Sequence, residues 1–555
     1  MVNIRVLPIK SNSGMKDKDV FVYLLQDNWN DYSFKTLYHL FLSGYYSESG
    51  EPIRFGEVKI LKKGQTEDDG IQLSRGDYVS LSDDFCSLGQ TLDYYERIAS
   101  LKSEYKEKIL KSLNDVIFKP QIKSDFNEES GWLTSLMRGL SETDDIFILS
   151  PYLLNRDYNS IPSIELKLSF INGDMEGPIT FDFDAPSYGY LVGDKLPCRM
   201  NVIVGQNGSG KSSILSKISR VAFASSKDRM SDALSKVGTI TPHGIGFPKI
   251  ISVAYSAFDS FKIPGVSVED KKQILSDIKS SKGRYVFCGV RDIGQELIEY
   301  IESFTGTDIL PDDEIINDRL SSTKLKSISS MCDEVSTLLL LVKSKRRVRI
   351  LKSAISILSK ELSFKEMEGS LLEAIKSDSL SKLFFECSTG HKFIIHTIIS
   401  IIAHAEKRSL ILMDEPETHL HPPLLAVFMT SIRYALEEFD SFCIVATHSP
   451  IVVQETLSRH VNIIKRLGNK VDITSPDIET YGENLSAITN LVFSLSGDFT
   501  QFHEELDKLT MFYVETNKNK TVDYIYKEIE KVFDNGLSMQ ARSYVMSQIV
   551  GTLGG

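Results

Sequence analysis

The stretch that most constrains this chain is residues 201–215, which read NVIVGQNGSGKSSIL. An apolar run leads into Gly205, and Gly210, Lys211 and Ser212 follow at the spacing G-x-x-x-x-G-K-S of a P-loop. Small residues in such a loop let backbone N–H groups wrap around a phosphate, and the positive end of the following helix also favours an anion. The stretch therefore predicts a strand, a phosphate-binding loop and a helix, and with them a nucleotide site.

Each position of this loop has an expected role. Lys211 can reach the β- and γ-phosphates of a nucleotide, and the Ser212 hydroxyl can bind Mg²⁺. A chance glycine-rich turn is the alternative, and it is disfavoured because every fixed position and the strand–loop–helix context are present. The predicted nucleotide-binding residues here are Gly205, Asn207, Gly208, Ser209, Gly210, Lys211, Ser212 and Ser213.

Composition limits the remaining possibilities. The chain has 555 residues and a net charge of −12, so its surface as a whole repels polyanions, and nucleic-acid binding would need a local basic patch. Its six cysteines are scattered without a C-x-x-C pair, which predicts free thiols rather than zinc ligands or a disulfide framework. The sequence contains no apolar run of about 18 residues and begins without a signal-peptide core. We therefore expect a cytoplasmic protein without a membrane partner.

Two apolar strands further along end in residues suited to phosphate chemistry. Residues 410–413 lead into Asp414 and Glu415, and residues 442–446 lead through a threonine into His448. Such strands, separated by a helix, predict a parallel β–α–β core. Downstream of a P-loop, Asp414 is expected to orient Mg²⁺, Glu415 to polarise the attacking water, and His448 to contact the γ-phosphate or that water. An ordinary acidic turn and a strand-end histidine that only caps a turn are the disfavoured alternatives.

Two other stretches are weaker candidates for binding nucleotide or metal. Ser388 and Gly390 precede a predicted helix over residues 393–405, where they could bind an anion, although an ordinary helix cap fits these residues alone better. Residues 256–259 follow an apolar run and could place a polar side chain near Mg²⁺, but they fit a plain turn better.

In this order, GQNGSGKS, STGH, LILMDEPETHLHP and ATHSP resemble the P-loop, signature, Walker B and H-switch motifs of ABC-type ATPases. The chain is most similar to the bacterial SMC/RecF-like and OLD-like branch, often labelled AAA-family. Residues 479–493 also resemble the tail of stand-alone ATPases from anti-phage defence operons, such as the Septu and retron-associated PtuA ATPases. Two departures matter: His391 stands where the signature usually has Gln or Glu, and the Q-loop glutamine is absent, with Ser256 or Asp259 near its place.

The resemblance implies ATP and Mg²⁺ as ligands and a head-to-tail homodimer, or a higher homo-oligomer, that closes on nucleotide. It also implies a partner effector, such as an HNH nuclease, because no second set of catalytic residues stands out in the sequence. Each nucleotide would lie between two sets of residues: Lys211, Ser212, Asp414 and Glu415 of one copy, and Ser388 and Gly390 of the other.

Together these features predict an α/β fold, with an ABC-type P-loop ATPase domain, a helical insertion and a small N-terminal α+β domain. The expected segments are the N-terminal domain of unknown role over residues 1–160, the first ATPase half with the P-loop over 161–265, the helical insertion over 266–383, the second half with signature, Walker B and H-switch over 384–500, and a C-terminal helical segment over 501–555.

Two functions stay open. The first is an ATPase that dimerises on nucleotide and controls an effector, with a nuclease favoured, in anti-phage defence. The second is a DNA-repair or DNA-end-processing ATPase that binds nucleic acid directly. The basic run could grip a nucleic-acid backbone, but it fits a solvated helix face equally well. That run comprises Lys343, Lys345, Arg346, Arg347 and Arg349. Arg291 is either a structural arginine or a phosphate contact.

Overall fold

The computed structural model of the chain describes residues 2–9, 14–47, 49–184, 196–304, 310–492 and 501–554. The chain forms two compact units, Met1–Leu485 and Ser486–Gly555. The predicted boundary between the ATPase domain and the C-terminal segment, at residue 500, lies within the second of these units.

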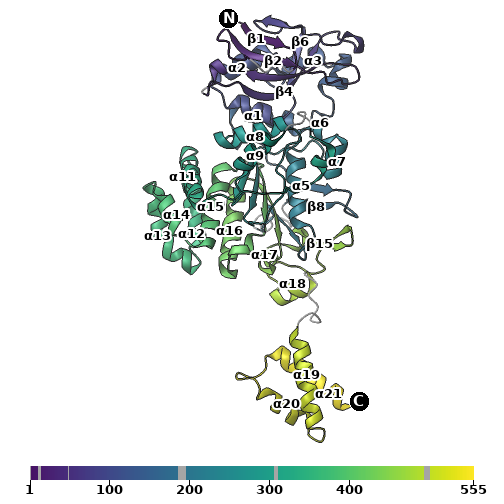
Figure 1. The fold of residues 1–555 in the computed structure, drawn as a ribbon, viewed down its shortest axis with the longest axis vertical. Coiled ribbons are helices and arrows are strands. Elements are labelled where there is room, and N and C mark those ends of the chain that lie inside the picture. The colour runs from purple at the N-terminus through teal and green to yellow at the C-terminus, as the bar shows by residue number, and fades with distance from the viewer. Residues whose placement is uncertain are drawn as a thin grey trace, which may run out of the picture. The chain divides into compact units, whose positions relative to one another are not determined.

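A seven-stranded sheet forms the centre of the first unit, in the order β12-β11-β13-β14-β9-β15-β16 (Figure 1). Neighbouring strands are parallel from β12 to β15, and β16 is antiparallel to β15. Apolar residues on both faces explain why β9 and β14 are buried along their whole length. This confirms the predicted parallel core. The strands are β9 (Met200–Val204), β11 (Ile250–Ala254), β12 (Tyr285–Gly289), β13 (Leu410–Asp414), β14 (Phe442–Thr447), β15 (Val461–Leu467) and β16 (Lys470–Thr474).

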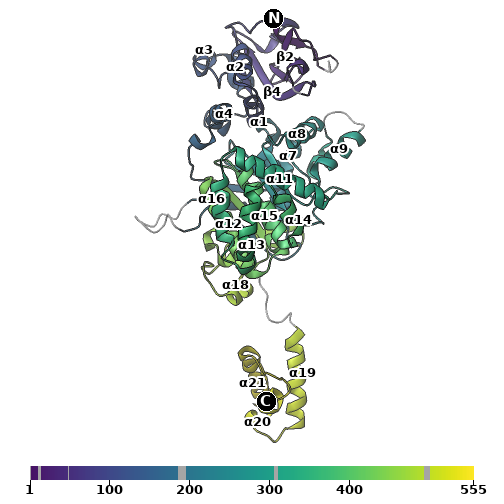
Figure 2. The ribbon, with the colours of Figure 1, turned by 90° about the vertical axis from the view of Figure 1, so that its left-hand side faces the viewer.

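Helices cover both faces of this sheet. Helix α5 (Lys211–Phe223) packs against β11, β13 and β14. Helices α15 (Thr389–His404) and α16 (Pro422–Glu438) lie on the opposite side of the sheet (Figures 1 and 2). An outer helical layer packs beside α15 and α16, and it consists of α11 (Ile328–Ser344), α12 (Val348–Leu358), α13 (Leu362–Lys376) and α14 (Leu380–Glu386).

The predicted helical insertion over residues 266–383 needs a correction. Strand β12 falls inside it and pairs with β11 in the central sheet. Its sequence, YVFCG, is a five-residue apolar run, and a run this short between two helices carries little periodicity. The flanking helices are α8 (Val268–Ser280), α9 (Ile293–Ser303) and α10 (Asp312–Ile316). The continuous helical part of the insertion therefore begins only at α11.

The N-terminal residues form a separate six-stranded sheet in the order β5-β1-β2-β3-β4-β6. Its strands are β1 (Val2–Leu7), β2 (Val20–Gln26), β3 (Leu37–Leu42), β4 (Ile53–Lys62), β5 (Gly76–Tyr78) and β6 (Phe85–Gly89). The helices that follow it are α1 (Leu92–Ala99), α2 (Ser103–Ser112), α3 (Lys123–Phe126) and α4 (Asp145–Asn155). Three ion pairs with little exposure to solvent fasten this part to the rest of the first unit: Asp93–Arg284, Glu96–Lys249 and Asp145–Arg408.

Smaller elements complete the first unit. A three-stranded antiparallel sheet contains β7 (Lys167–Ile171), β8 (Ile179–Asp182) and β10 (Thr239–Thr241). Short helices are α6 (Ser226–Arg229), α7 (Asp232–Val237), α17 (Pro450–Gln454) and η7 (Pro416–His419), and α18 (Leu485–Leu491) follows.

The second unit is helical and has its own core. Its helices are α19 (Gln501–Thr516), α20 (Val522–Glu530) and α21 (Met539–Gly554). Ile525, Ile529, Val545 and Ile549 are fully buried within it. In the parts of the chain that the structure describes, we find no helix with the length and apolar character needed to cross a membrane.

Candidate functional site

Three of the predicted motifs lie at one edge of the central sheet because of strand order. The P-loop follows β9, His448 follows the adjacent β14, and Asp414 ends β13 on the far side of β14. The carboxyl ends of parallel strands share an edge, and ligands bind there in open α/β sheets. The sequence-predicted catalytic residues therefore converge although more than 200 positions separate Ser212 from Asp414.

The P-loop forms a cradle that only small residues permit. Gly208 and Gly210 have φ angles of +79° and +103°, in the left-handed region that favours glycine. A Cβ at Gly205 would lie 2.4 Å from the carbonyl oxygen of Ile464. The hydroxyl of Ser209 is buried without a hydrogen-bond partner among the described residues. These features fit a loop whose polar groups are arranged for an oxyanion.

Lys211 begins α5 and is folded into this loop. Its ammonium group donates hydrogen bonds to the carbonyl oxygens of Gly205, at 2.9 Å, and Gln206, at 3.2 Å. Burial lowers the pKa of Lys211, and the nearby carboxylates of Glu415 and Asp414 oppose that shift. The exposed Asn207 lies in the loop before Lys211, and the hydroxyl of Ser213, in the first turn of α5, donates a hydrogen bond to Asp318.

Ser212 and Asp414 form the candidate metal site. The Ser212 hydroxyl donates to Asp414 Oδ1 at 3.0 Å. Burial raises the pKa of Asp414 to about 7, and the carboxylates of Glu415 and Asp259 push it in the same direction. A hydroxyl beside a carboxylate that is crowded by other acids offers the hard oxygen ligands that Mg²⁺ prefers, and a divalent cation would relieve the crowding. The residues present therefore fit Mg²⁺.

Glu415 lies next to this pair with an unusual backbone. Its φ angle is +44°, and its side chain is 34% exposed, so the carboxylate can reach water at the sheet edge. His448 Nδ1 is 3.8 Å from Glu415 Oε1. A carboxylate with access to water and a neighbouring imidazole is a suitable general base.

Sequence reasoning missed Glu417, which holds the histidine in place. Its Oε1 accepts hydrogen bonds of 2.7 Å from the Thr447 hydroxyl and from the backbone N–H of His448. The same oxygen lies 3.1 Å from His448 Nδ1, and the side chain is only 8% exposed. The signal was present in the sequence as the second glutamate of the EPETH run after Walker B, but nothing local indicates its partner.

The signature residues Ser388 and Gly390 lie at the start of α15. Ser388 caps α15 by accepting a hydrogen bond from the His391 N–H, and its side chain is exposed. A Cβ at Gly390 would lie 2.8 Å from the carbonyl oxygen of His419, so glycine lets the start of α15 pack against η7. This is the helix cap that the residues alone favoured, and its exposure leaves Ser388 accessible to another molecule.

Of the two candidates near the Q-loop position, the structure brings Asp259 to the site. Asp259 lines a cavity of about 50 Å³ together with Ser212 and Asp414. Its carboxylate pairs with the buried Arg291 at 3.2 Å, and Arg291 also pairs with Glu296 at 2.7 Å. These two ion pairs support the structural interpretation of Arg291.

The basic run is largely neutralised within the protein. Lys345 and Arg347 both pair with the buried Glu406. Lys343 pairs with Asp378, and Arg349 lies 3.3 Å from Glu438. Arg346 is exposed. Because four of the five cations already have carboxylate partners, the geometry favours a solvated surface over a nucleic-acid grip.

A buried polar cluster that sequence reasoning did not find lies behind the signature helix. His396 of α15 is fully buried, and its Nδ1 is hydrogen-bonded to Tyr255 and lies 3.8 Å from the sulfur of Cys288. Its Nε2 lies 3.3 Å from Glu334 of α11. Burial would lower the pKa of His396, but Cys288 and Glu334 outweigh it and raise that pKa to about 9. The cluster joins the ends of β11 and β12 to the helical layer.

Comparison with known proteins supports the assignment of the domain. Residues 265–454 match a family model described as "AAA domain, putative AbiEii toxin, Type IV TA system". The protein ea59 of Escherichia phage lambda is 27% identical over 95% of this chain and 94% of its own length. The Septu protein PtuA of Bacillus thuringiensis is 24% identical over 46% of this chain and 67% of its own length.

Among solved structures, the ATP-binding cassette MJ1267 of an ABC transporter, in its ADP conformation, matches 59% of this chain and 95% of its own with 12% identity and a TM-score of 0.27. The resemblance to P-loop ATPases rests on the four motifs in order, the parallel sheet that gathers three of them at one edge, and the match of residues 265–454. Residues 265–454 are therefore similar to this AAA domain, the motifs at the sheet edge resemble those of ABC/SMC-like P-loop ATPases, and the chain is similar in sequence to the Septu protein PtuA.

Proposed function

We propose that this chain hydrolyses ATP at the edge of its central sheet and uses the nucleotide to control a partner effector. The observation that carries the catalytic part is the 3.0 Å hydrogen bond from Ser212 to Asp414, because it joins the P-loop to the Walker B strand. Glu415 and His448 follow directly on the same edge.

Each residue has a role that follows from its position. The P-loop N–H groups and Lys211 bind the phosphates, and Ser212 and Asp414 hold Mg²⁺, which neutralises developing charge on the phosphate oxygens when it is bound. Glu415 orients the attacking water and accepts its proton. His448 contacts the γ-phosphate or this water, while Glu417 fixes the histidine in position.

The proposed dimer completes the site. Ser388 is exposed at the start of α15, and its hydrogen bonds run to His391 of the same helix. In the head-to-tail arrangement that the family resemblance implies, Ser388 and Gly390 of one copy close over the nucleotide of the other. ATP then holds two copies together, and hydrolysis releases them.

The role in defence and the effector are proposed from relatives. The similarity to the Septu protein PtuA covers 46% of this chain, and the matched domain carries the description of a toxin–antitoxin component. We therefore propose that the effector is a separate protein, with an HNH nuclease as the leading candidate. The second function, direct DNA processing, has less support because the basic run is already paired.

Hydrolysis is tested by measuring phosphate release from purified full-length protein. Lys211→Ala should abolish nucleotide binding, and Glu415→Gln should abolish turnover while retaining bound ATP. An exposed control, Glu386→Gln on α14, should leave turnover unchanged. Turnover that survives both site substitutions would refute the catalytic assignment.

The shared site is tested by mixing two inactive variants. Lys211→Ala lacks the phosphate-binding lysine, and Ser388→Arg blocks the opposite half-site. A mixed head-to-tail dimer keeps one intact site, so random mixing should restore about a quarter of the wild-type activity. Recovery of no activity would count against a shared site.

The DNA-processing function is tested by adding duplex DNA. Turnover that rises with DNA, together with weaker DNA binding by the Arg346→Ala variant, would favour that function instead.

A further inference from the structure

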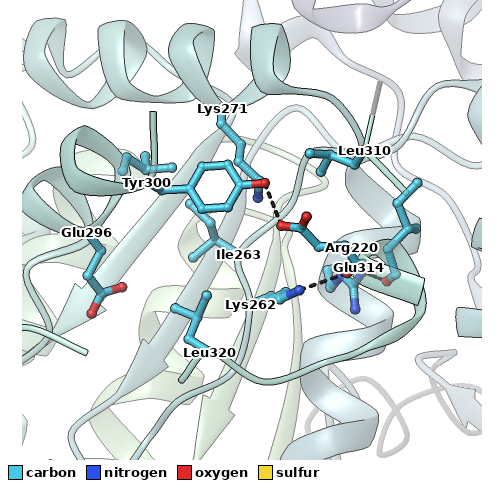
Figure 3. Close-up of a pocket in the computed structure, with 12 residues that line it drawn as sticks. Arg220, Lys262, Ile263, Lys271, Glu296, Tyr300, Leu310, Glu314 and Leu320 are labelled. Atoms are coloured by element: carbon cyan, nitrogen blue, oxygen red, sulfur yellow. Dashed lines mark hydrogen bonds between the residues drawn. The ribbon is translucent and has the colours of Figure 1, made fainter. Parts of the chain in front are cut away.

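A small cavity with an excess of positive charge lies at the end of α5 remote from the P-loop. Its volume is about 40 Å³, and it is enclosed by α5, α8, α9, α10 and the loop that follows β11 (Figure 3). The residues that line it are Arg220, Lys262, Ile263, Gly265, Lys271, Glu296, Leu297, Tyr300, Leu310, Glu314, Ile315 and Leu320.

Three cationic side chains meet at this cavity. Arg220 is 5% exposed, and one guanidinium nitrogen, Nη2, donates to the carbonyl oxygen of Ile315. Its other terminal nitrogen, Nη1, is buried without a hydrogen-bond partner in the described part of the chain. Lys271 is 7% exposed, and its ammonium group lies 5.2 Å from the centre of the Tyr300 ring. Lys262 donates to the carbonyl oxygen of Glu314 at 2.8 Å.

The carboxylates that line the cavity do not balance these charges. Glu314 accepts a hydrogen bond from the Tyr300 hydroxyl. Glu296 is already paired with Arg291, whose second partner is Asp259. Burial lowers the pKa of Lys271 to about 8, and the nearby Arg220 and Lys262 add to that shift. Asp270 and Asp318 offset part of the positive charge from outside the cavity lining, but Arg220 Nη1 has no hydrogen-bond partner among the described residues. A buried cation whose donor is unsatisfied is stabilised when an anion joins it.

The size of the cavity limits which anion can enter. A bound water needs roughly 10–15 Å³ of such space, so about 40 Å³ accommodates a compact oxyanion. Sites for larger organic ligands are about 300–1,000 Å³, so a nucleoside does not fit. Lys262 and Ile263 also line the cavity beside Ser212 and Asp414, so the two cavities share a wall.

We propose that the cavity lined by Arg220, Lys262 and Lys271 is a second anion site, separate from the P-loop, that binds inorganic phosphate. Lys271 supplies charge from α8, Lys262 reaches it from the wall shared with the candidate metal site, and Arg220 presents its unpartnered nitrogen from α5. The site binds phosphate whether or not the chain hydrolyses ATP, so it extends the proposed function without resting on it.

The test uses the full-length chain with Lys211→Ala, which removes phosphate binding at the P-loop. Equilibrium dialysis with labelled inorganic phosphate at pH 7 and constant ionic strength should find about one phosphate per chain. Adding Lys271→Met should weaken this binding at least tenfold. The matched control is Lys272→Met, because the neighbouring Lys272 pairs with Glu269 on the exposed side of α8. Unlabelled ADP should not displace the phosphate, which separates this site from a nucleotide site.

Three results would overturn the proposal. Loss of all phosphate binding on Lys211→Ala alone would place every bound phosphate at the P-loop. Equal binding in the Lys271→Met and Lys272→Met variants would show that the cations serve only to fasten α8 and α10, and displacement by ADP would assign a nucleotide ligand. Should Lys271→Met fail to fold, Lys262→Met carries the same expectation, and Lys271→Arg should retain binding because it keeps the charge.

Discussion

The buried ion pair between Asp145 and Arg408 gives the most direct test of how the N-terminal part is fastened to the ATPase core. Arg408 Nη2 lies 2.7 Å from both carboxylate oxygens of Asp145. The side chains are 2% and 7% exposed for Arg408 and Asp145. Asp145 Oδ2 also accepts from the Gly246 N–H at 2.8 Å. Asp145→Asn removes the negative charge while nearly preserving volume.

The expected cost follows from the charge that is left behind. Removing one partner of a buried pair typically destabilises a protein by about 3–5 kcal/mol, because the other charge stays buried without compensation. The asparagine amide oxygen can still accept from Gly246, so we expect the lower end, about 3 kcal/mol. That is a large share of the roughly 5–15 kcal/mol by which domains are stable.

Denaturant unfolding of the full chain at pH 7, followed by circular dichroism, measures this loss. A double-mutant cycle with Arg408→Met should give a coupling of more than about 1 kcal/mol between the two positions. The control is Arg349→Met, because the Arg349 side chain is 78% exposed and its pair with Glu438 should contribute less than about 1 kcal/mol. A loss below about 1 kcal/mol for Asp145→Asn, or additive effects in the cycle, would refute the reasoning.

Three further predictions test the site and its surroundings. Glu417→Ala removes the acceptor of the Thr447 hydroxyl and of the His448 N–H, so His448 loses its fixed position. Single-turnover hydrolysis should therefore fall at least tenfold while ATP binding persists. Gly390→Ala should lower turnover because its Cβ would lie 2.8 Å from a backbone oxygen. The control is Gly369→Ala on α13, where a Cβ meets no atom within 4 Å. It should leave turnover intact and stabilise the helix by about 0.5–1 kcal/mol. His396 and Lys326 outweigh burial and lower the pKa of Glu334 to about 2. Glu334→Gln should therefore destabilise the protein by about 2 kcal/mol at pH 7, and this difference from wild type should disappear as pH falls from about 4.5 through 2; a difference that is constant with pH would contradict the pairing.

Apolar runs bounded by turn residues were the parts of the fold most readily predicted from sequence. The strand expected over residues 410–413 is observed as Leu410–Asp414, and the one expected over 442–446 as Phe442–Thr447. Buried parallel strands need apolar side chains on both faces, so their pattern is visible without any tertiary information. β12 was missed because its five residues carry no such context in the sequence, and only its pairing with β11 defines it.

The residues of the candidate site also fall into those that the sequence predicts and those that it does not. Loop glycines and strand-end acids have local signatures, because phosphate and Mg²⁺ impose their own spacing. Glu417 and the cluster around His396 have none, because their partners lie 30 to 141 residues away. A buried polar group satisfied at long range looks the same in sequence as an exposed one. The basic run left two interpretations open for the same reason, since its partners Glu406 and Asp378 lie outside the run.

The short helix η7 (Pro416–His419) links the two halves of the proposed mechanism within one chain. Its Glu417 holds the H-switch histidine, while the carbonyl oxygen of its last residue sets the close approach to Gly390 at the start of α15. A shift of His448 that also displaces Glu417 would therefore move η7, against which Gly390 at the start of α15 packs. Because close-packed segments respond to such shifts as units, we infer that phosphate contact at the sheet edge and the position of Ser388 are coupled through these four residues. In the proposed dimer, this coupling would let loss of the γ-phosphate at one half-site loosen the half-site that the same chain offers to its neighbour.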